Sequence, residues 1–305
     1  MTTKGLIAGC FDIIHPGYIR MFQDAKTVCD HLIIALQSDP TIDRPESKNP
    51  PIYSAQERLL IISSIKYVDE VVQYSTEKDL YDLLKTLKEK KTIDVRILGN
   101  DYIGKGFTGD DLEIPIYFHD RNYNLSSSWS VSKARKCIIK TTMVDCHDKT
   151  NWKDGSRQLQ LHENRFMIYG IVSGYFNPVH RGHIDYFEEA KKHCDYLFAI
   201  VNNDQQVKVK GSKPFMDESE RQKIISSIRY VDEAMISIDT DASVSKSIAA
   251  IAERLDTIAS VMFFNSGDRD LGTYNFAESD VCERLAVIPF FLDLPKVNSS
   301  SKLLS

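Results

Sequence analysis

Two short stretches of the chain place imidazoles and a glycine where a helix is expected to begin. The later stretch, NPVHRGHIDYFEEAK, carries His180 and His183, whereas the earlier one, DIIHPGYIRMFQDAK, carries His15 and Tyr18. The free N–H groups and the positive dipole end of a helix N-terminus favour an anion. Histidines at such a turn suit a phosphate whose charge grows in a transition state. A metal pair on HxxH is the weaker alternative, because no third ligand lies nearby in sequence.

Cationic side chains cluster in the polar loop that follows the second apolar run of the later copy. Lys208, Lys210 and Lys213 lie within six residues of one another. They are suited to neutralising phosphates, and the alternative is a solvated loop without a ligand. The corresponding loop of the earlier copy, DPTIDRPESKNPPIYSAQER, offers only Arg44 and Lys48.

Serine-rich segments end both copies, RNYNLSSSWSV in the first and KVNSSSKLL in the second. Each follows a strand-like apolar run, so its hydroxyls could cap a helix whose N-terminus also holds phosphate. The alternative is a simple cap or a flexible tail. The residues concerned are Ser126, Ser127, Ser128, Ser299, Ser300 and Ser301.

The two stretches belong to a repeat of domain size. His15 falls on His180 at an offset of 165 residues, and VCDHL falls on HCDYL at the same offset. ERLLIISSIKYVDE (57–70) matches ERQKIISSIRYVDE (220–233) at an offset of 163, and SSS recurs at 173. Blocks in the same order at so long a period indicate tandem domains rather than a solenoid.

Each copy alternates strand-like and helix-like segments. The apolar runs 5–11 and 168–176 suit buried strands, and the stretches 18–29 and 183–194 place apolar residues at helical spacing. A second strand, a polar loop, a helix through ERLLIISSI or its counterpart, and a third strand follow. This order predicts an α/β fold of two tandem Rossmann-like domains, each a mostly parallel sheet with helices on both faces. Ligands of such sheets bind beyond the carboxyl ends of the strands, where the histidine turns fall.

Composition fits a globular chain of two domains. The 305 residues are 42% hydrophobic and 27% charged, with a net charge of −5, which gives no pull toward nucleic acid or an anionic membrane. No apolar run reaches the ~18 residues of a membrane helix. The six cysteines form no CxxC pair, which favours reduced thiols and a cytoplasmic location. We expect one domain at 1–142, a polar linker at 143–164 and a second domain at 165–305. We expect no metal ligated by the protein, and a homo-oligomer is a further possibility.

Both halves resemble the cytidylyltransferase-like nucleotidyltransferases, whose hallmark is HxGH after a strand together with a serine- or threonine-rich segment near the domain end. The first half resembles glycerol-3-phosphate cytidylyltransferase through GCFDIIHPG, RILGNDYIGKGFTG and RNYNLSSSWSV. The second half is similar to the cytidylyl- and sugar-phosphate adenylyltransferases through GYFNPVHRGH, VNNDQQVKVKGSKPF and NSGDRD. The tandem arrangement resembles that of ethanolamine-phosphate cytidylyltransferase.

The resemblance implies transfer of a nucleotide to a phosphomonoester with release of pyrophosphate and with Mg²⁺ on the triphosphate. It implies that His180 and His183, and His15 in the first half, hydrogen-bond the phosphates, and that Lys210 neutralises them. The nucleotide-side residues that it implies are Tyr175, Phe176, Asp268, Arg269, Ser299, Ser300 and Ser301, with Cys10, Phe11, Asp101, Arg121, Ser126, Ser127 and Ser128 in the first half. The phosphate- or substrate-side residues that it implies are Lys208, Lys213 and Arg221, with Arg58 and Lys105 in the first half.

The first half departs from the family pattern at Tyr18. A phenol donates one hydrogen bond but carries no positive charge at neutral pH, and loss of a well-placed donor costs about 3 kcal/mol, or two orders of magnitude in rate. The first half is therefore a slow enzyme, a binding domain or a catalyst of different geometry. We predict transfer from CTP to a glycerol-, polyol-, sugar- or amino-alcohol phosphate, mainly in the second half. The alternatives are an ATP-dependent sugar-phosphate adenylyltransferase and a non-catalytic nucleotide sensor or scaffold.

Overall fold

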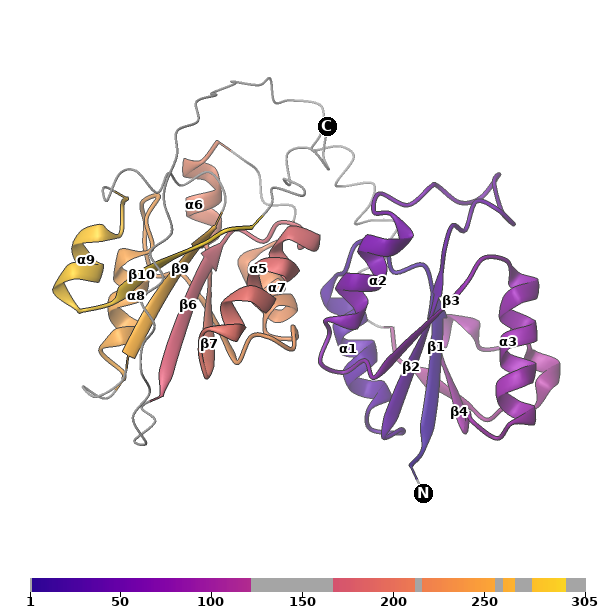
Figure 1. Ribbon diagram of the computed structural model, residues 1–305. Coiled ribbons are helices and arrows are strands. Elements are labelled where there is room, and N and C mark those ends of the chain that lie inside the picture. The colour runs from indigo at the N-terminus through magenta and orange to yellow at the C-terminus, as the bar shows by residue number, and fades with distance from the viewer. Residues whose placement is uncertain (1, 122–166, 212–215, 256–259, 267–275, 295–305) are drawn as a thin grey trace. The chain divides into compact units, whose positions relative to one another are not determined.

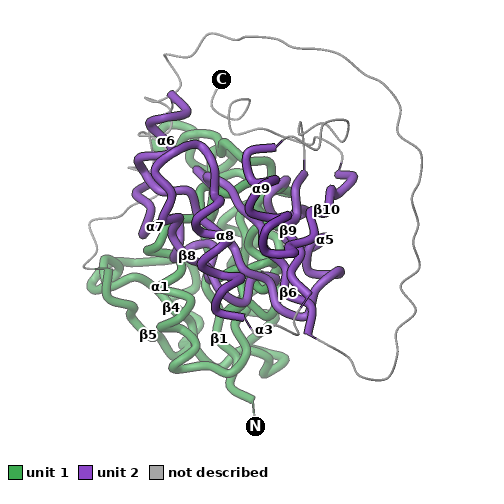
Figure 2. Tube along the Cα trace, turned by 90° about the vertical axis from the view of Figure 1, so that its left-hand side faces the viewer, with its two compact units in different colours: residues 1–133, 178–181, 227–229 green, residues 134–177, 182–226, 230–305 purple. Residues whose placement is uncertain are grey.

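The computed structural model describes residues 2–121, 167–211, 216–255, 260–266 and 276–294. The chain divides into two compact units, which Figure 2 colours separately. The first unit comprises residues 1–133, 178–181 and 227–229, and the second comprises 134–177, 182–226 and 230–305. The linker expected at 143–164 lies outside the described residues, so the domain limits of 142 and 165 stay predictions.

The first unit is built on a five-stranded sheet with strand order β3-β2-β1-β4-β5. Its elements are β1 (Lys4–Gly9), α1 (Pro16–Ala25), β2 (His31–Gln37), α2 (Ala55–Ser63), β3 (Glu70–Tyr74), α3 (Glu77–Glu89), β4 (Val95–Gly99) and β5 (Ile116–His119). All neighbouring strands run parallel. Helices α1 and α2 cover one face of the sheet and α3 covers the other (Figure 1).

The second unit repeats this plan, with strand order β8-β7-β6-β9-β10 and parallel pairing throughout. Its elements are β6 (Ile168–Gly174), α5 (Arg181–Lys192), β7 (Tyr196–Val201), α6 (Asp204–Val209), α7 (Glu218–Ile225), β8 (Glu233–Ile236), α8 (Ser245–Ala252), β9 (Ser260–Ser266), α9 (Ser279–Arg284) and β10 (Ile288–Leu292). Helices α5 and α7 lie on one face, and α8 and α9 lie on the other (Figure 1). The predicted fold of two Rossmann-like α/β domains is confirmed.

The central strands are apolar without interruption because helices cover both of their faces. In β2, HLIIALQ, the last six residues are all buried. On the α3 side of the first sheet, Leu6 and Ile33 pack into one core cluster with Leu80 and Leu84. The second sheet is packed in the same manner by α8, whose Ile248 and Ile251 join a core cluster with strand residues of β6, β7 and β9.

The segment after β7 differs from the sequence-based expectation. We expected a polar loop after Asp204, and the structure forms the short helix α6 there. A capping box begins this helix, since Asn203 and Gln206 each accept a hydrogen bond from the other's backbone N–H. Six residues are too few to show helical periodicity in the sequence, which explains the wrong prediction.

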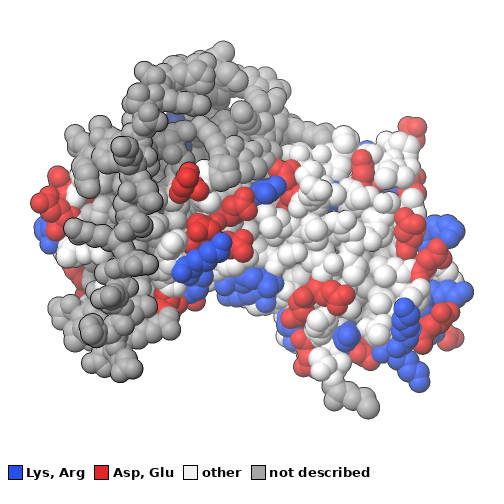
Figure 3. Space-filling view, in the orientation of Figure 1, with Lys and Arg blue, Asp and Glu red and all other residues white. Residues whose placement is uncertain are grey.

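Charges of both signs are interspersed over the described residues on the face shown in Figure 3. This surface agrees with the net charge of −5. Every helix in the described part of the chain is too short or too polar to span a bilayer.

Candidate active site

The strand order creates an equivalent crevice in each unit. In the first sheet β2 and β3 lie on one side of β1, whereas β4 and β5 lie on the other, so the order reverses between β1 and β4. In the second sheet it reverses between β6 and β9. Open parallel sheets bind ligands at this reversal, outside the carboxyl ends of the strands. The residues that follow Gly9, Gly99 and Gly174 therefore form the described parts of the candidate sites, and those that follow Ser266 lie outside the described residues.

A strained turn follows the first strand of each unit. Phe11 and Phe176 both adopt a left-handed backbone conformation with φ of 49°, which costs about 1–3 kcal/mol for a residue of this kind. Both rings are buried. A Cβ atom at Gly174 would lie 2.7 Å from the ring of Phe176, so glycine at the strand end leaves room for this turn. The turn carries the chain from the strand to the histidine segment in both units.

His15 is the N-cap of α1, and Pro16 occupies the first helical position. The N–H of Gly17 donates to His15 Nδ1 at 3.2 Å, so the neutral ring carries its proton on Nε2. Burial, together with the nearby guanidinium of Arg121, lowers the pKa of His15 to about 4. The buried Nε2–H finds no hydrogen-bond partner among the described residues. His15 therefore presents a neutral donor that lacks an acceptor, which suits a phosphate oxygen.

The second repeat places both motif histidines at the start of α5, although the segment 178–181, which contains His180, is grouped with the first unit. His180 precedes the helix and is 6% exposed, and burial lowers its pKa to about 4. His183 lies in the first turn, with its ring edge-on to Phe176 at a centroid distance of 5.0 Å. With pKa values of about 4, His15 and His180 are neutral at pH 7.

Tyr18 takes the place of His183 in the first unit. Its ring lies edge-on to Phe11 at 5.0 Å, which repeats the contact between His183 and Phe176. It also stacks on His15 at 4.0 Å and is only 8% exposed. The substitution therefore exchanges a partly exposed imidazole for a buried phenol ring packed against the remaining histidine.

The first unit adds an ion pair at the ends of β4 and β5. Arg121 Nη1 lies 3.1 Å from both carboxylate oxygens of Asp101. Cys10 follows β1, and burial raises its pKa to about 11, so its sulfur is a thiol at neutral pH. Lys105 is exposed in the loop after β4. The structure thus groups Cys10, Asp101 and Arg121 with the strand ends that flank the crevice.

Of the predicted lysines, Lys210 lies near the strand-end turn of the second unit. Lys208 lies in α6 and Lys210 immediately follows it, both exposed. Lys210 Nζ lies 4.5 Å from the centroid of the ring of Tyr175, the first residue after β6. The cation is therefore held beside the segment that leads to His180.

Arg58 and Arg221, for which the resemblance implied a phosphate-side role, are both buried. They are 1% and 0% exposed. Arg221 donates to the carbonyls of Met216 (3.2 Å), Tyr175 (2.8 Å) and Asn202 (2.6 Å) and to the carboxylate of Asp204 (2.7 Å). Arg58 donates to the equivalent carbonyls of Tyr53 (3.1 Å), Cys10 (2.7 Å) and Gln37 (2.7 Å) and to that of Ser38. Each guanidinium joins two strand ends to the loop before the next helix, and its contact with phosphate stays a prediction.

One pair of positioning residues was missed from the sequence. The Asp12 carboxylate accepts from the N–H groups of Ile52 and Tyr53 at 2.9 Å each. Its counterpart Asn177 accepts from the N–H of Met216 at 3.3 Å. Both tie the strained turn to the loop that precedes α2 or α7. The aligned dipeptides Phe-Asp and Phe-Asn were the available signal.

The remaining predicted site residues lie outside the described residues. They are Lys213, Asp268, Arg269, Ser126, Ser127, Ser128, Ser299, Ser300 and Ser301. In the described part of the chain, no three His, Cys, Asp or Glu side chains are grouped so as to hold a metal ion.

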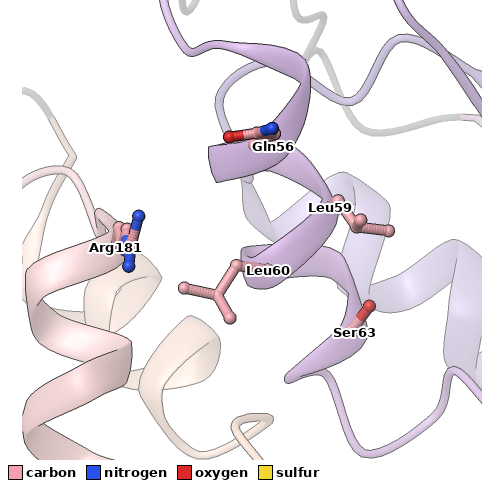
Figure 4. A pocket seen from close by; sticks show the side chains of 5 residues that line it. All are labelled: Gln56, Leu59, Leu60, Ser63 and Arg181. Carbon is pink, nitrogen blue, oxygen red and sulfur yellow. The ribbon is translucent and has the colours of Figure 1, made fainter.

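Gln56, Leu59, Leu60 and Ser63 of α2 line part of a separate pocket (Figure 4). Its wall is largely aliphatic and amide in character. None of the strand-end residues described above lines it, so it is not the candidate active site.

Comparison with known proteins agrees with the repeated site. A model of the family described as Cytidylyltransferase-like matches residues 6–113 and 171–270. Ethanolamine-phosphate cytidylyltransferase of Arabidopsis thaliana is 25% identical over 281 residues, covering 77% of this chain and 65% of its own. The protein of the same name from Dictyostelium discoideum is 26% identical over 266 residues, covering 75% and 71%. Bifunctional protein HldE of Wolinella succinogenes is 38% identical over 104 residues, covering 34% and 21%. The chain thus spans just under two thirds of the plant relative and about a fifth of HldE.

Proposed function

Because the chain belongs to the cytidylyltransferase-like family, we propose that it is a nucleotidyltransferase that joins CTP to a small phosphomonoester and releases pyrophosphate. The acceptor is a glycerol-, polyol-, sugar- or amino-alcohol phosphate. Two relatives named ethanolamine-phosphate cytidylyltransferase support this proposal, since each aligns with about three quarters of the chain.

The observation that carries the proposal is the buried, neutral imidazole at the crevice of each sheet. His15 and His180 stand at the start of a helix that follows the first strand, and each has its pKa lowered to about 4. A buried imidazole N–H at a helix N-terminus favours an anionic oxygen as its acceptor. The phosphates of a nucleotide meet this requirement.

In the proposed reaction, an oxygen of the acceptor phosphate attacks the α-phosphorus of the nucleotide. The bond from that phosphorus to the bridging oxygen breaks, and the electron pair leaves with pyrophosphate. His180 and His183 would donate hydrogen bonds to the phosphate oxygens. Because His180 is neutral at pH 7, it brings no positive charge, and Lys208, Lys210 and Lys213 would supply part of the charge that the phosphates need. A Mg²⁺ ion on the triphosphate supplies additional charge compensation when it is bound.

We assign most of the turnover to the second half, which has both histidines and the lysines. The first half keeps His15, Arg121 and Asp101, so it is expected to bind nucleotide and to react slowly or not at all. Tyr18 costs this half a donor at the second motif position. The remaining imidazole of this half, His15, is neutral at pH 7.

A second candidate is adenylyl transfer from ATP to a sugar phosphate. The motifs of the second half that resemble sugar-phosphate adenylyltransferases favour it, and the matches to bifunctional protein HldE are consistent with it. The two candidates share one chemistry and differ in the base of the donor and in the acceptor.

Pyrophosphate release from the full-length protein tests both candidates. CTP and ATP, each with Mg²⁺, are combined with ethanolamine phosphate, glycerol 3-phosphate, a polyol phosphate and a hexose phosphate. We expect one CTP pair to give turnover that is lost in the His180→Ala/His183→Ala variant and kept in the control His31→Gln, whose imidazole pairs with Glu70 on the surface. Turnover with ATP alone would select the second candidate. Nucleotide binding without pyrophosphate from any pair would overturn both and leave a sensor.

A further inference from the structure

Gln206 is fully buried in a helix of only six residues. Its side-chain oxygen accepts from Asn202 Nδ2 and from the N–H of Asn203, both at 3.1 Å. Its side-chain nitrogen donates to the carbonyls of Asp241 at 2.9 Å and Ser243 at 2.6 Å. All four hydrogen-bonding positions of the amide are thus used. A helix this short is unstable alone, and Gln206 fixes it to the end of β7 and to the loop after β8.

The backbone carbonyl of Gln206 connects this anchor to the strand-end turn. It accepts from the N–H of Lys210 at 3.1 Å and from the hydroxyl of Tyr175 at 3.5 Å. Lys210 Nζ in turn lies 4.5 Å from the centroid of the Tyr175 ring. An ammonium group over the face of an aromatic ring is attracted by the negative charge of that face. The ends of the lysine, its amide and its ammonium group, are therefore each held, one directly by Gln206 and the other by Tyr175.

The first unit lacks this arrangement within its described residues. Cys10 stands at the position of Tyr175, and Thr41 stands at the position of Gln206. The segment after β2 is instead tied to the start of α3, where Arg44 pairs with Glu77 at 3.0 Å. The contacts that hold a lysine beside the strand-end turn thus occur in the unit with both motif histidines.

We propose that Tyr175 and Gln206 are positioning residues that hold Lys210 beside the strand-end turn before the nucleotide binds. The inference rests on the proposed function, because it takes Lys210 to be a phosphate contact. A lysine held in one place has already lost rotamer freedom that phosphate binding would otherwise have to remove. The arrangement raises affinity for the triphosphate without adding a contact to it.

A double-mutant cycle on the full-length protein tests the coupling. Tyr175→Leu removes the ring face and should raise KM for Mg²⁺–CTP about fivefold, which corresponds to a weak, partly exposed cation–π contact. Tyr175→Phe keeps the ring and should raise KM less than twofold. In a Lys210→Ala background the leucine substitution should have no further effect, because the two residues act as a unit. An equal effect of Tyr175→Leu in both backgrounds would overturn the proposal.

Gln206→Glu extends the test to the anchor. The carboxylate cannot donate to the carbonyls of Asp241 and Ser243, so α6 should loosen and KM should rise as in Tyr175→Leu, with kcat less affected. An unchanged KM in a folded Gln206→Glu protein would remove Gln206 from the proposal. If this variant does not fold, the Tyr175 cycle still decides whether Lys210 is held.

A measurement that does not depend on activity separates this proposal from the proposed function. Reductive ¹³C-methylation labels the lysines, and Lys210→Arg identifies the signal of Lys210. We expect a ring-current shift of that signal in the wild type and in Tyr175→Phe, and its loss in Tyr175→Leu. A signal at the position of free lysine in the wild type would refute the proposal, whatever the enzyme does. A shifted signal combined with parental turnover in Lys210→Ala would instead refute the phosphate role of Lys210.

Discussion

Acid should destabilise the first unit in part through His15. Burial and Arg121 lower its pKa from 6.5 to about 4, so the unfolded chain binds a proton in this range that the folded state does not. The contribution of neutral His15 to the free energy of unfolding is therefore fully present above about pH 6.5 and is lost as the pH falls toward 4. The difference between the unfolded and folded pKa of His15 corresponds to about 3 kcal/mol of unfolding free energy, at 1.36 kcal/mol per pKa unit. About 2 kcal/mol of this should be lost between pH 7 and pH 4.5.

His15→Asn isolates this effect. Asparagine retains a side-chain acceptor for the N–H of Gly17 at the N-cap but does not titrate. Urea unfolding at pH 7 and pH 4.5, with peptides of the first unit followed by pulsed hydrogen exchange and mass spectrometry, measures the loss in each protein. The wild type should lose about 2 kcal/mol more than His15→Asn, and the surface control His31→Gln should behave as the wild type. Equal acid sensitivity in the wild type and His15→Asn would refute the reasoning that His15 is buried and neutral.

Three further predictions concern other residues of the two sites. His180→Ala/His183→Ala should lower turnover by about 100-fold with an unchanged circular dichroism spectrum, and parental turnover would contradict the assigned site. Arg221→Lys should destabilise the second unit by about 3 kcal/mol or more, because one ammonium cannot reach the carbonyls and carboxylate that the buried guanidinium joins; an unchanged thermal midpoint would contradict this. Tyr18→His in the His180→Ala/His183→Ala background should raise pyrophosphate release above that background, and no gain would favour a binding role for the first half.

The fold and the location of the histidines could be predicted because their signals are local or repeated. The uninterrupted apolar run of β2 predicts a strand covered on both faces, and the last six residues of this strand are buried in the structure. The short link from a strand-like run to an amphipathic stretch placed His15 at a helix start, where it is the N-cap. The domain-length repeat predicted a second sheet of the same plan, and both sheets have the same strand order.

The features that were not predicted depend on contacts distant in sequence. From the sequence, an arginine near the start of an amphipathic helix is expected to be exposed. The carbonyls that accept hydrogen bonds from the buried Arg58 and Arg221 come together only when the strand ends are assembled. The left-handed backbone conformation of Phe11 and Phe176 could not be predicted from their residue type, because bulky side chains disfavour this conformation. The neutrality of His180 depends on its depth of burial, which residue spacing does not specify.

The most direct test of the central claim is ³¹P NMR of the products formed from CTP, Mg²⁺ and the acceptor that gives turnover. Transfer to a phosphomonoester predicts that the three signals of CTP and the monoester signal are replaced by one pyrophosphate signal and the two coupled signals of a CDP-linked diester, one of each product per CTP consumed. CMP with pyrophosphate, or CDP with phosphate, would show hydrolysis in place of transfer. Either outcome, or unchanged CTP with every acceptor while the nucleotide binds, would contradict the assignment of a nucleotidyltransferase.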